Sequence, residues 1–254
     1  MWKYANPTFF LALVARVLPW VAGLTVLLLA VGLYMTFFVA PADYQQGDTV
    51  RIMYIHVPAA WLSVFCYMTM AASALGTLVW RHPLADAAQK AAAPIGAAFT
   101  FICLVTGSLW GKPMWGTWWV WDARLTSVLV LFLIYLGLIA LWQTIVEPGR
   151  AARAAAILTL IGVVNIPIIK FSVDWWNTLH QPASVFRMGG PTIHPTMLWP
   201  LMVMALAFTM LFLTLHLMAT RNEILRRRVH RLTMLAAGSG ESDVAGARFA
   251  DQEA

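Results

Sequence analysis

Charged side chains are scarce in this 254-residue chain: Asp, Glu, Lys and Arg together make up 11% of it, while 61% is hydrophobic. A soluble domain usually carries about 25% charged residues, so a water-soluble enzyme of this size is excluded. Disorder of the whole chain is excluded as well, because disordered chains are poor in the apolar residues that abound here. The composition therefore predicts a protein that crosses the membrane several times, since one span takes about 20 apolar residues.

Other features are also missing. The two cysteines, Cys66 and Cys103, lie in apolar stretches outside any CxxC or CxxCH motif, which argues against a thiol oxidoreductase and a c-type cytochrome. No GxxxxGK[ST] sequence occurs, so the chain does not hydrolyse ATP by itself. No series of acids crosses the apolar runs, as a proton pump or ion transporter would commonly need.

What the sequence does contain is six long apolar runs, which must be helical because every backbone group in lipid needs an internal partner. They cover residues 17–39, 57–80, 91–110, 127–146, 154–171 and 195–220. The first run is longer than the apolar part of a signal peptide and is expected to stay as a span. Pro167 is expected to kink the fifth run. The predicted fold is an all-α membrane protein of six transmembrane helices.

The basic residues predict the orientation. With the N-terminus inside, eleven Lys and Arg residues fall on inner segments and five on outer segments, which favours cytoplasmic N- and C-termini. The arginine cluster of residues 221–231 follows the last apolar run, as a cytoplasmic anchor does, and no folded basic domain surrounds it, so no nucleic acid partner is expected. We expect one membrane domain over residues 1–231 and a disordered cytoplasmic tail over residues 232–254, which are rich in Ala, Gly, Ser and acids.

The second outer loop, about residues 111–126, is unusually rich in tryptophan. Five of the 13 tryptophans lie between Trp110 and Trp121, interleaved with glycine and proline. An interfacial aromatic belt explains one or two of them. A rigid aromatic surface that stacks on a large, flat, apolar ligand explains the density better. If the chain were helical from Thr117 onward, Trp118, Trp121 and Asp122 would share a face.

Polar residues beside this loop leave alternatives open. Asp122 and Arg124 form either a local ion pair or helix cap, or an acid and a cation for an anionic ligand. The outer cations Arg51, Arg124, Arg187 and Lys170 either contact lipid headgroups or clamp carboxylates of a ligand.

Three histidines fall on the predicted outer face. His56 stands just before the second apolar run, His180 lies in the sequence DWWNTLHQPAS, and His194 stands before Pro195 at the start of the sixth run. Imidazole is a good ligand for iron, and two histidines can hold a haem from opposite faces. Capping or packing is the preferred interpretation for His194. A zinc or copper site is disfavoured because the loops lack HxxH or ExxH spacing.

The sequence WGTWWVWDAR, which starts at Trp115, resembles the WWD domain of haem-handling proteins. Together with MYIHVPAAW, WWNTLHQ and the six-span layout, it resembles over residues 10–225 the CcmC family of the bacterial cytochrome c maturation pathway. The resemblance implies a protein of the bacterial inner membrane whose functional face is periplasmic. It also implies that haem b is bound there and presented to a haem chaperone. On this basis the chain is expected to be a delivery protein rather than an enzyme.

The same resemblance assigns roles and partners. His56 and His180 would be the axial ligands of the haem iron. The haem and chaperone platform would consist of Trp115, Trp118, Trp119, Trp121 and Asp122. The partners would be the chaperone, a small single-span subunit, and the ATPase and permease subunits of an ABC transporter, besides membrane lipid.

Two other functions are alternatives to haem delivery. A transporter that moves haem or another substrate through its own helix bundle would need polar residues along an interior path, and the sequence shows few. A structural subunit anchored by its tryptophans would carry no chromophore.

Overall fold

The computed structural model describes residues 6–250, with side chains described to residue 237, and all the named elements of this part of the chain are helices. Its elements are α1 (Pro7–Tyr34), the π-helical turn η2 (Met35–Val39), the 3-10 turn η3 (Asp48–Ile52), α2 (Met53–Val79), α3 (Ala85–Trp115), α4 (Ala123–Thr144), α5 (Pro148–Gly162), α6 (Asn165–Trp175) and α7 (Pro195–Ala250).

Within the described residues, six helical segments are long and apolar enough to cross a membrane. α1 with η2, η3 with α2, and α5 with α6 each make one of these segments, and α3, α4 and α7 make the other three. The predicted all-α fold with six membrane helices is therefore confirmed. The side of the membrane on which each end lies remains a prediction.

The fifth segment is broken between α5 and α6, as Pro167 predicts. Proline lacks the N–H that would bond to the carbonyl of Val163 in a continuous helix. The chain passes the gap with tighter bonds, in which the amide of Ile166 donates to Val163 at 2.9 Å. The side-chain amide of Asn165 donates to the Ser127 carbonyl at 2.9 Å and so connects the break to α4.

Two helix boundaries differ from the prediction at the end that carries the tryptophan loop. α2 begins at Met53, because η3 runs directly into it, so His56 lies inside the helix rather than before it. α3 continues to Trp115 and ends at Gly116, whose φ of +75° favours glycine. Residues 117–122 are not helical, so the face proposed for Trp118, Trp121 and Asp122 does not form.

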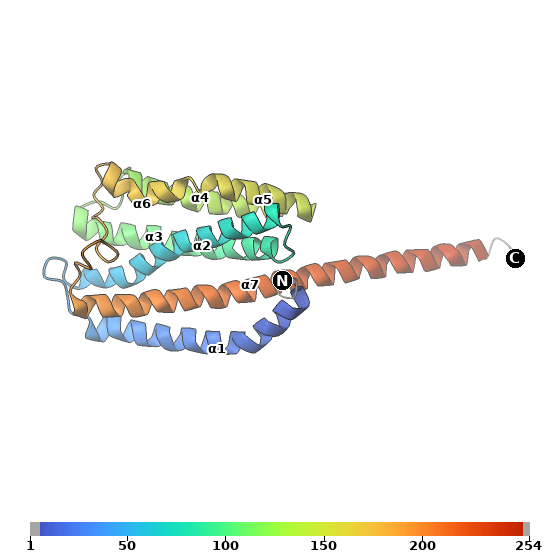
Figure 1. Cartoon of the computed structure of the whole chain (residues 1–254), viewed down its shortest axis with the longest axis horizontal. Coiled ribbons are helices and arrows are strands. Elements are labelled where there is room, and N and C mark those ends of the chain that lie inside the picture. The colour runs from blue at the N-terminus through green and yellow to red at the C-terminus, as the bar shows by residue number, and fades with distance from the viewer. Residues whose placement is uncertain (1–5, 251–254) are drawn as a thin grey trace.

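The helices form three groups (Figure 1). α2 and α3 lie in the middle of the bundle, α1 pairs with α7 on one side, and α4 packs against α3, α5 and α6 on the other. Hydrogen bonds between helices hold the centre: Tyr67 donates to the Thr159 carbonyl at 2.9 Å, and Tyr135 donates to the Ser63 carbonyl at 2.7 Å. Such bonds matter in lipid, where burial of apolar surface between helices gives little driving force.

α7 extends well beyond the bundle in Figure 1. The composition of residues 232–250 predicts disorder, yet these residues are helical. They continue the helix of α7, and a helix that already exists grows without a new nucleation step. Residues 251–254 of the predicted tail lie outside the described residues. At the opposite end of the bundle, the segments that join α1 to α2, α3 to α4, and α6 to α7 gather together (Figure 1).

Candidate haem site

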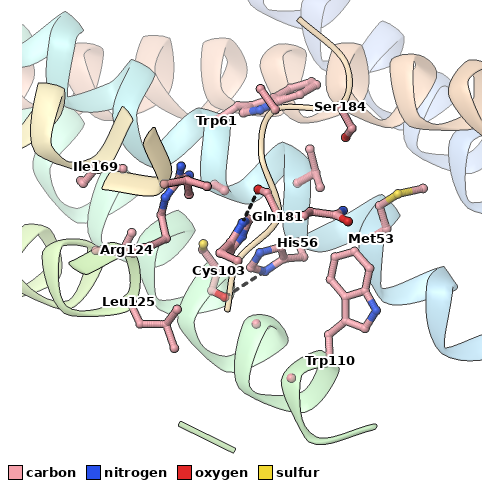
Figure 2. A pocket seen from close by; sticks show the side chains of 18 of the residues that line it. Met53, His56, Trp61, Cys103, Trp110, Arg124, Leu125, Ile169, Gln181 and Ser184 are labelled. Atoms are coloured by element: carbon pink, nitrogen blue, oxygen red, sulfur yellow. Dashed lines mark hydrogen bonds between the residues drawn. The ribbon is translucent and has the colours of Figure 1, made fainter. Parts of the chain in front are cut away.

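A cavity of about 480 Å³ opens among these three connecting segments. α2, α3, α4, α6 and the segment of residues 176–194 supply most of its wall. His56, His180 and Arg124 all line it, and Figure 2 shows His56, Arg124 and Gln181 among the side chains of its wall. The structure thus brings together three residues that lie far apart in the sequence.

The imidazole of His56 is held in place by hydrogen bonds to its Nδ1 atom. The ring is 8% exposed, and its Nδ1 lies 3.1 Å from the Cys103 carbonyl and 3.1 Å from Thr106 Oγ1. A carbonyl can only accept, and Thr106 already donates to the Ile102 carbonyl. Nδ1 of His56 therefore carries the proton, and Nε2 keeps the lone pair that binds a metal.

Two neighbours make this position of His56 possible. Trp110 packs edge-on against the imidazole at 5.7 Å between ring centroids, and its Nε1 donates to Gln46 Oε1 at 2.8 Å. Gly107 leaves the space that the ring occupies, because a Cβ there would lie 2.9 Å from His56 Cε1.

His180 has the same bonding pattern in a different setting. Its Nδ1 lies 3.1 Å from the Gln181 carbonyl, so Nδ1 again donates and Nε2 has the free lone pair. Burial lowers the pKa of His180, and the nearby Arg124 acts in the same direction, whereas the Gln181 carbonyl and Asp122 oppose the shift. The imidazole is neutral at pH 7, which is the form that binds iron.

The predicted tryptophans divide into two groups. Trp115 and Trp119 line the cavity, and Trp115 lies 6.2 Å from the His180 ring between centroids. Nε1 of Trp119 is buried without a hydrogen-bond partner among the described residues, which makes it a donor available to a ligand. Trp118 and Trp121 are 54% and 77% exposed and do not line the cavity.

Asp122 joins two segments of the site. Its Oδ1 accepts from the Leu125 amide at 2.8 Å and so caps α4, while its Oδ2 accepts from the Leu179 amide at 3.3 Å. Of the two alternatives for Asp122, the helix cap is the one that the structure shows. Arg124 lines the cavity, and its Nε donates to Ser172 Oγ of α6 at 2.8 Å.

Three other candidates lie outside the cavity wall. Arg51 pairs with Asp48 at 2.9 Å and donates to the carbonyls of Thr36 in η2 and of Ala40, which follows η2. Arg187 is exposed in the segment between α6 and α7. Nδ1 of His194 lies 2.8 Å from Thr196 Oγ1 at the start of α7, in agreement with a capping role.

Sequence reasoning missed several residues of the cavity. Trp61 of α2, Gln46 of the first connecting segment and Cys103 beside His56 belong to this group. Thr106 also contacts the His56 ring, although it does not line the cavity. The sequence signal for Trp61 was present in MYIHVPAAW, one and a half turns beyond His56 on the same helix. The contacts of Gln46 and Thr106 depend on packing between distant segments.

The arrangement suits a flat, amphipathic ligand with a central metal. Within the described residues, no group of three or more His, Cys, Asp or Glu side chains gathers as a site for a bare metal ion. Two histidines with free Nε2 atoms, aromatic walls and one guanidinium instead match a metal carried by an apolar macrocycle with acidic substituents.

Comparisons with known proteins place the chain in a family. The family model described as Heme exporter protein C matches residues 1–235. The Heme exporter protein C of Bradyrhizobium diazoefficiens is 71% identical over 233 residues, which cover 92% of this chain and 88% of that protein. The Escherichia coli K12 protein of the same name is 52% identical over 229 residues, 89% of this chain and 92% of that protein.

A relative from a eukaryotic organelle is similar to the chain as well. A mitochondrial protein of Marchantia polymorpha, described as ccmC-like and linked to cytochrome c biosynthesis, is 48% identical over 220 residues, 87% of this chain and 93% of that protein. Because the family model covers nearly the whole chain and the similarity to these relatives spans most of their length, the chain belongs to the CcmC family of Heme exporter protein C.

Proposed function

We propose that this multi-pass inner-membrane protein binds haem b in the cavity between His56 and His180 and presents it to a periplasmic haem chaperone. The broader role, haem handling in cytochrome c maturation, is supported by the family match and by the names of its relatives. Haem is the cargo in this function rather than a resident cofactor. The chain serves as a binding and delivery protein in it.

One observation carries the proposal. Two histidines from separate elements line one cavity, and each donates Nδ1–H to a backbone carbonyl. This bonding fixes the ring orientation and leaves Nε2 as the ligand atom, which is the usual state of histidines that bind metals. Random packing of two interfacial histidines has no reason to give both of them the same tautomer in one cavity.

The walls support the rest of the ligand. Trp115 and Trp119 offer aromatic surface to a porphyrin, and Nε1 of Trp119 lacks a protein acceptor among the described residues. Arg124 can pair with a propionate, since a guanidinium fits a carboxylate in a two-pronged contact. Arg51 and Arg187, which are also propionate candidates, reach a ligand only if their segments move toward the cavity.

The exposed tryptophans provide a surface for a partner. Trp118 and Trp121 lie beside the cavity residues in the chain but outside its wall, and both are more than half exposed. Large exposed aromatic side chains are common anchors in protein interfaces. We assign them to the contact with the chaperone. The single-span subunit and the ABC transporter ATPase and permease complete the proposed assembly.

Visible spectra of the purified protein test the haem site. His56→Ala and His180→Ala should each lose the low-spin bands of a bis-histidine haem, whereas His194→Ala, which changes a helix cap outside the cavity, should keep them. Addition of the chaperone should remove haem from the wild type. Unchanged spectra in both cavity variants would refute the ligand assignment, and haem that stays bound with the chaperone present would refute delivery.

A further inference from the structure

A second hollow adjoins the cavity on its membrane side. It has a volume of about 320 Å³ and is lined by Trp61, Leu62 and Phe65 of α2, Lys170 of α6, Phe186 of the segment before α7, and Ala205 and Thr209 of α7. All but Phe186 belong to helices that are apolar and long enough to span the membrane. This side groove, as we name it, is therefore open toward lipid rather than water.

The side groove exists because α6 and α7 do not close over α2. α6 packs along α4, and α7 packs along α1, α2 and α3. The two helices follow each other in the chain, yet the segment of residues 176–194 separates them. A strip of α2 between them is left uncovered, and Phe65 on it is 51% exposed.

Three residues belong to both the side groove and the cavity: Trp61, Lys170 and Phe186. The rings of Trp61 and Phe186 lie 5.1 Å apart between centroids and form the partition. In Figure 2, Trp61 stands across His56 from Trp110, at the edge of the cavity. This pair of rings, together with Lys170, thus lies between the two spaces.

Phe186, one of the two rings of the partition, lies in an exposed loop. Phe186 is 67% exposed and lies in a loop that the Thr192 amide closes on the Ser184 carbonyl at 2.9 Å. Gly189 and Gly190 in that loop both have positive φ values. Phe186 is therefore the member of the partition that can turn away by a side-chain rotation or a small shift of its loop, whereas Trp61 is fixed on α2.

From these features we infer that haem enters the cavity sideways from the lipid, through the side groove and past the Trp61–Phe186 partition. A porphyrin is flat and apolar and carries two carboxylates, so it partitions into a bilayer with its propionates toward the surface. Lys170 is the one cation of the side groove and lines the cavity as well, so it can accompany a propionate along the path. This inference rests on the proposed function and names the route by which its site is filled.

The depth of the side groove agrees with such a route. Trp61 lies five residues and Phe65 nine residues beyond His56 along α2, or about 7.5 and 13.5 Å at 1.5 Å per residue. The side groove therefore begins one to two helical turns beyond His56 and extends further along α2 toward the middle of the membrane. A permanently bound lipid chain is the competing occupant.

The test blocks the side groove without touching the cavity. Ala205 lines the side groove but not the cavity, so Ala205→Trp should fill it. Leu206→Trp is the matched control, because Leu206 is a neighbouring α7 residue that is 48% exposed and lines neither space. Each protein is reconstituted in vesicles, and haem uptake is followed by absorbance with haem supplied either in the lipid or in the aqueous phase.

We expect Ala205→Trp to slow uptake from lipid by about tenfold, which corresponds to ~1.4 kcal/mol on the entry barrier. Uptake from water and the final spectrum should match those of the wild type and Leu206→Trp. Equal rates in all proteins, as expected if a lipid chain fills the side groove, would overturn the lateral route. So would equal slowing from both sources. A wild type that takes up no haem from either source would overturn the proposed function itself.

Discussion

At the scale of single residues, Gly107 is the position where the smallest change should reach the iron ligand. A Cβ at Gly107 would lie 2.9 Å from Cε1 of His56, closer than real contacts allow. Gly107→Ala must therefore turn the imidazole or shift α3 against α2. A side chain forced about 30° from its rotamer costs about 0.5–1.5 kcal/mol, which corresponds to a two- to tenfold weaker affinity for haem. Haem titration of the purified variant measures this.

Gly137→Ala provides the matched control. Gly137 lies inside α4, and a Cβ there would meet nothing within 4 Å. Alanine is the better helix former, so this variant should keep its affinity for haem and unfold at the same or a slightly higher temperature. If Gly107→Ala also binds haem normally, the ring of His56 has more room than its contacts indicate, and the glycine has no role in the site.

At the scale of elements, Asp122 couples the start of α4 to the segment that carries His180. Asp122→Ala removes both hydrogen bonds. Loss of the α4 cap lowers the free energy of unfolding by about 1 kcal/mol, and loss of the bond to the Leu179 amide frees the residue next to His180. Asp122→Ser keeps a cap but has a single oxygen. We expect both variants to bind haem less tightly and only Asp122→Ala to be clearly less stable, as judged from haem titration and thermal unfolding.

Glu147→Ala separates the loss of a cap from the loss of the site. Glu147 caps α5 by accepting from the Gly149 and Arg150 amides, and it lies outside the cavity wall. The variant should lose stability as Asp122→Ala does and still bind haem like the wild type. Normal haem binding in both Asp122 variants would show that the bond to Leu179 does not position His180.

Element boundaries also show how far the sequence could predict this molecule. Apolar length alone predicts the six membrane helices, and Pro167 predicts the break in the fifth, because both effects are local. The start of α2 was missed because η3 continues directly into it, and this changes His56 from a loop residue to a helical one. α3 continues beyond the predicted end of the third run at residue 110 and stops at Gly116, whose φ of +75° favours glycine.

The composition of the site was less predictable than the helices. His56, His180, Arg124, Trp115 and Trp119 meet in one cavity, and all five were candidates from the sequence. The partners that orient the histidines are backbone carbonyls, and because every residue has one, the sequence cannot predict which of them binds a given histidine. The Trp110–Gln46 bond and the Trp61–Phe186 partition join segments that only the packed bundle brings together.

At the scale of the whole molecule, the ligand space is concentrated at one end of the bundle. The largest fully buried side chains of the described chain include Tyr67, Met70 and Tyr135, which fill the middle of the core. Tyr67 and Tyr135 are bonded to backbone carbonyls of neighbouring helices. A filled and internally bonded centre does not favour a substrate path through the bundle. It favours a protein that works at one membrane surface.

Which surface that is follows from a labelling experiment on the intact membrane. Met188 and Val146 are 98% and 95% exposed, and one membrane segment, α5 with α6, lies between them. The native cysteines Cys66 and Cys103 are buried, so background labelling should be low. With cytoplasmic termini, an impermeant maleimide should label Met188→Cys in cells whose inner membrane is intact, and Val146→Cys only after that membrane is opened. The reverse pattern would turn the cavity toward the cytoplasm and exclude delivery to a periplasmic chaperone, because the five candidate ligand and wall residues and the Phe186 loop all lie at the Met188 end of the bundle.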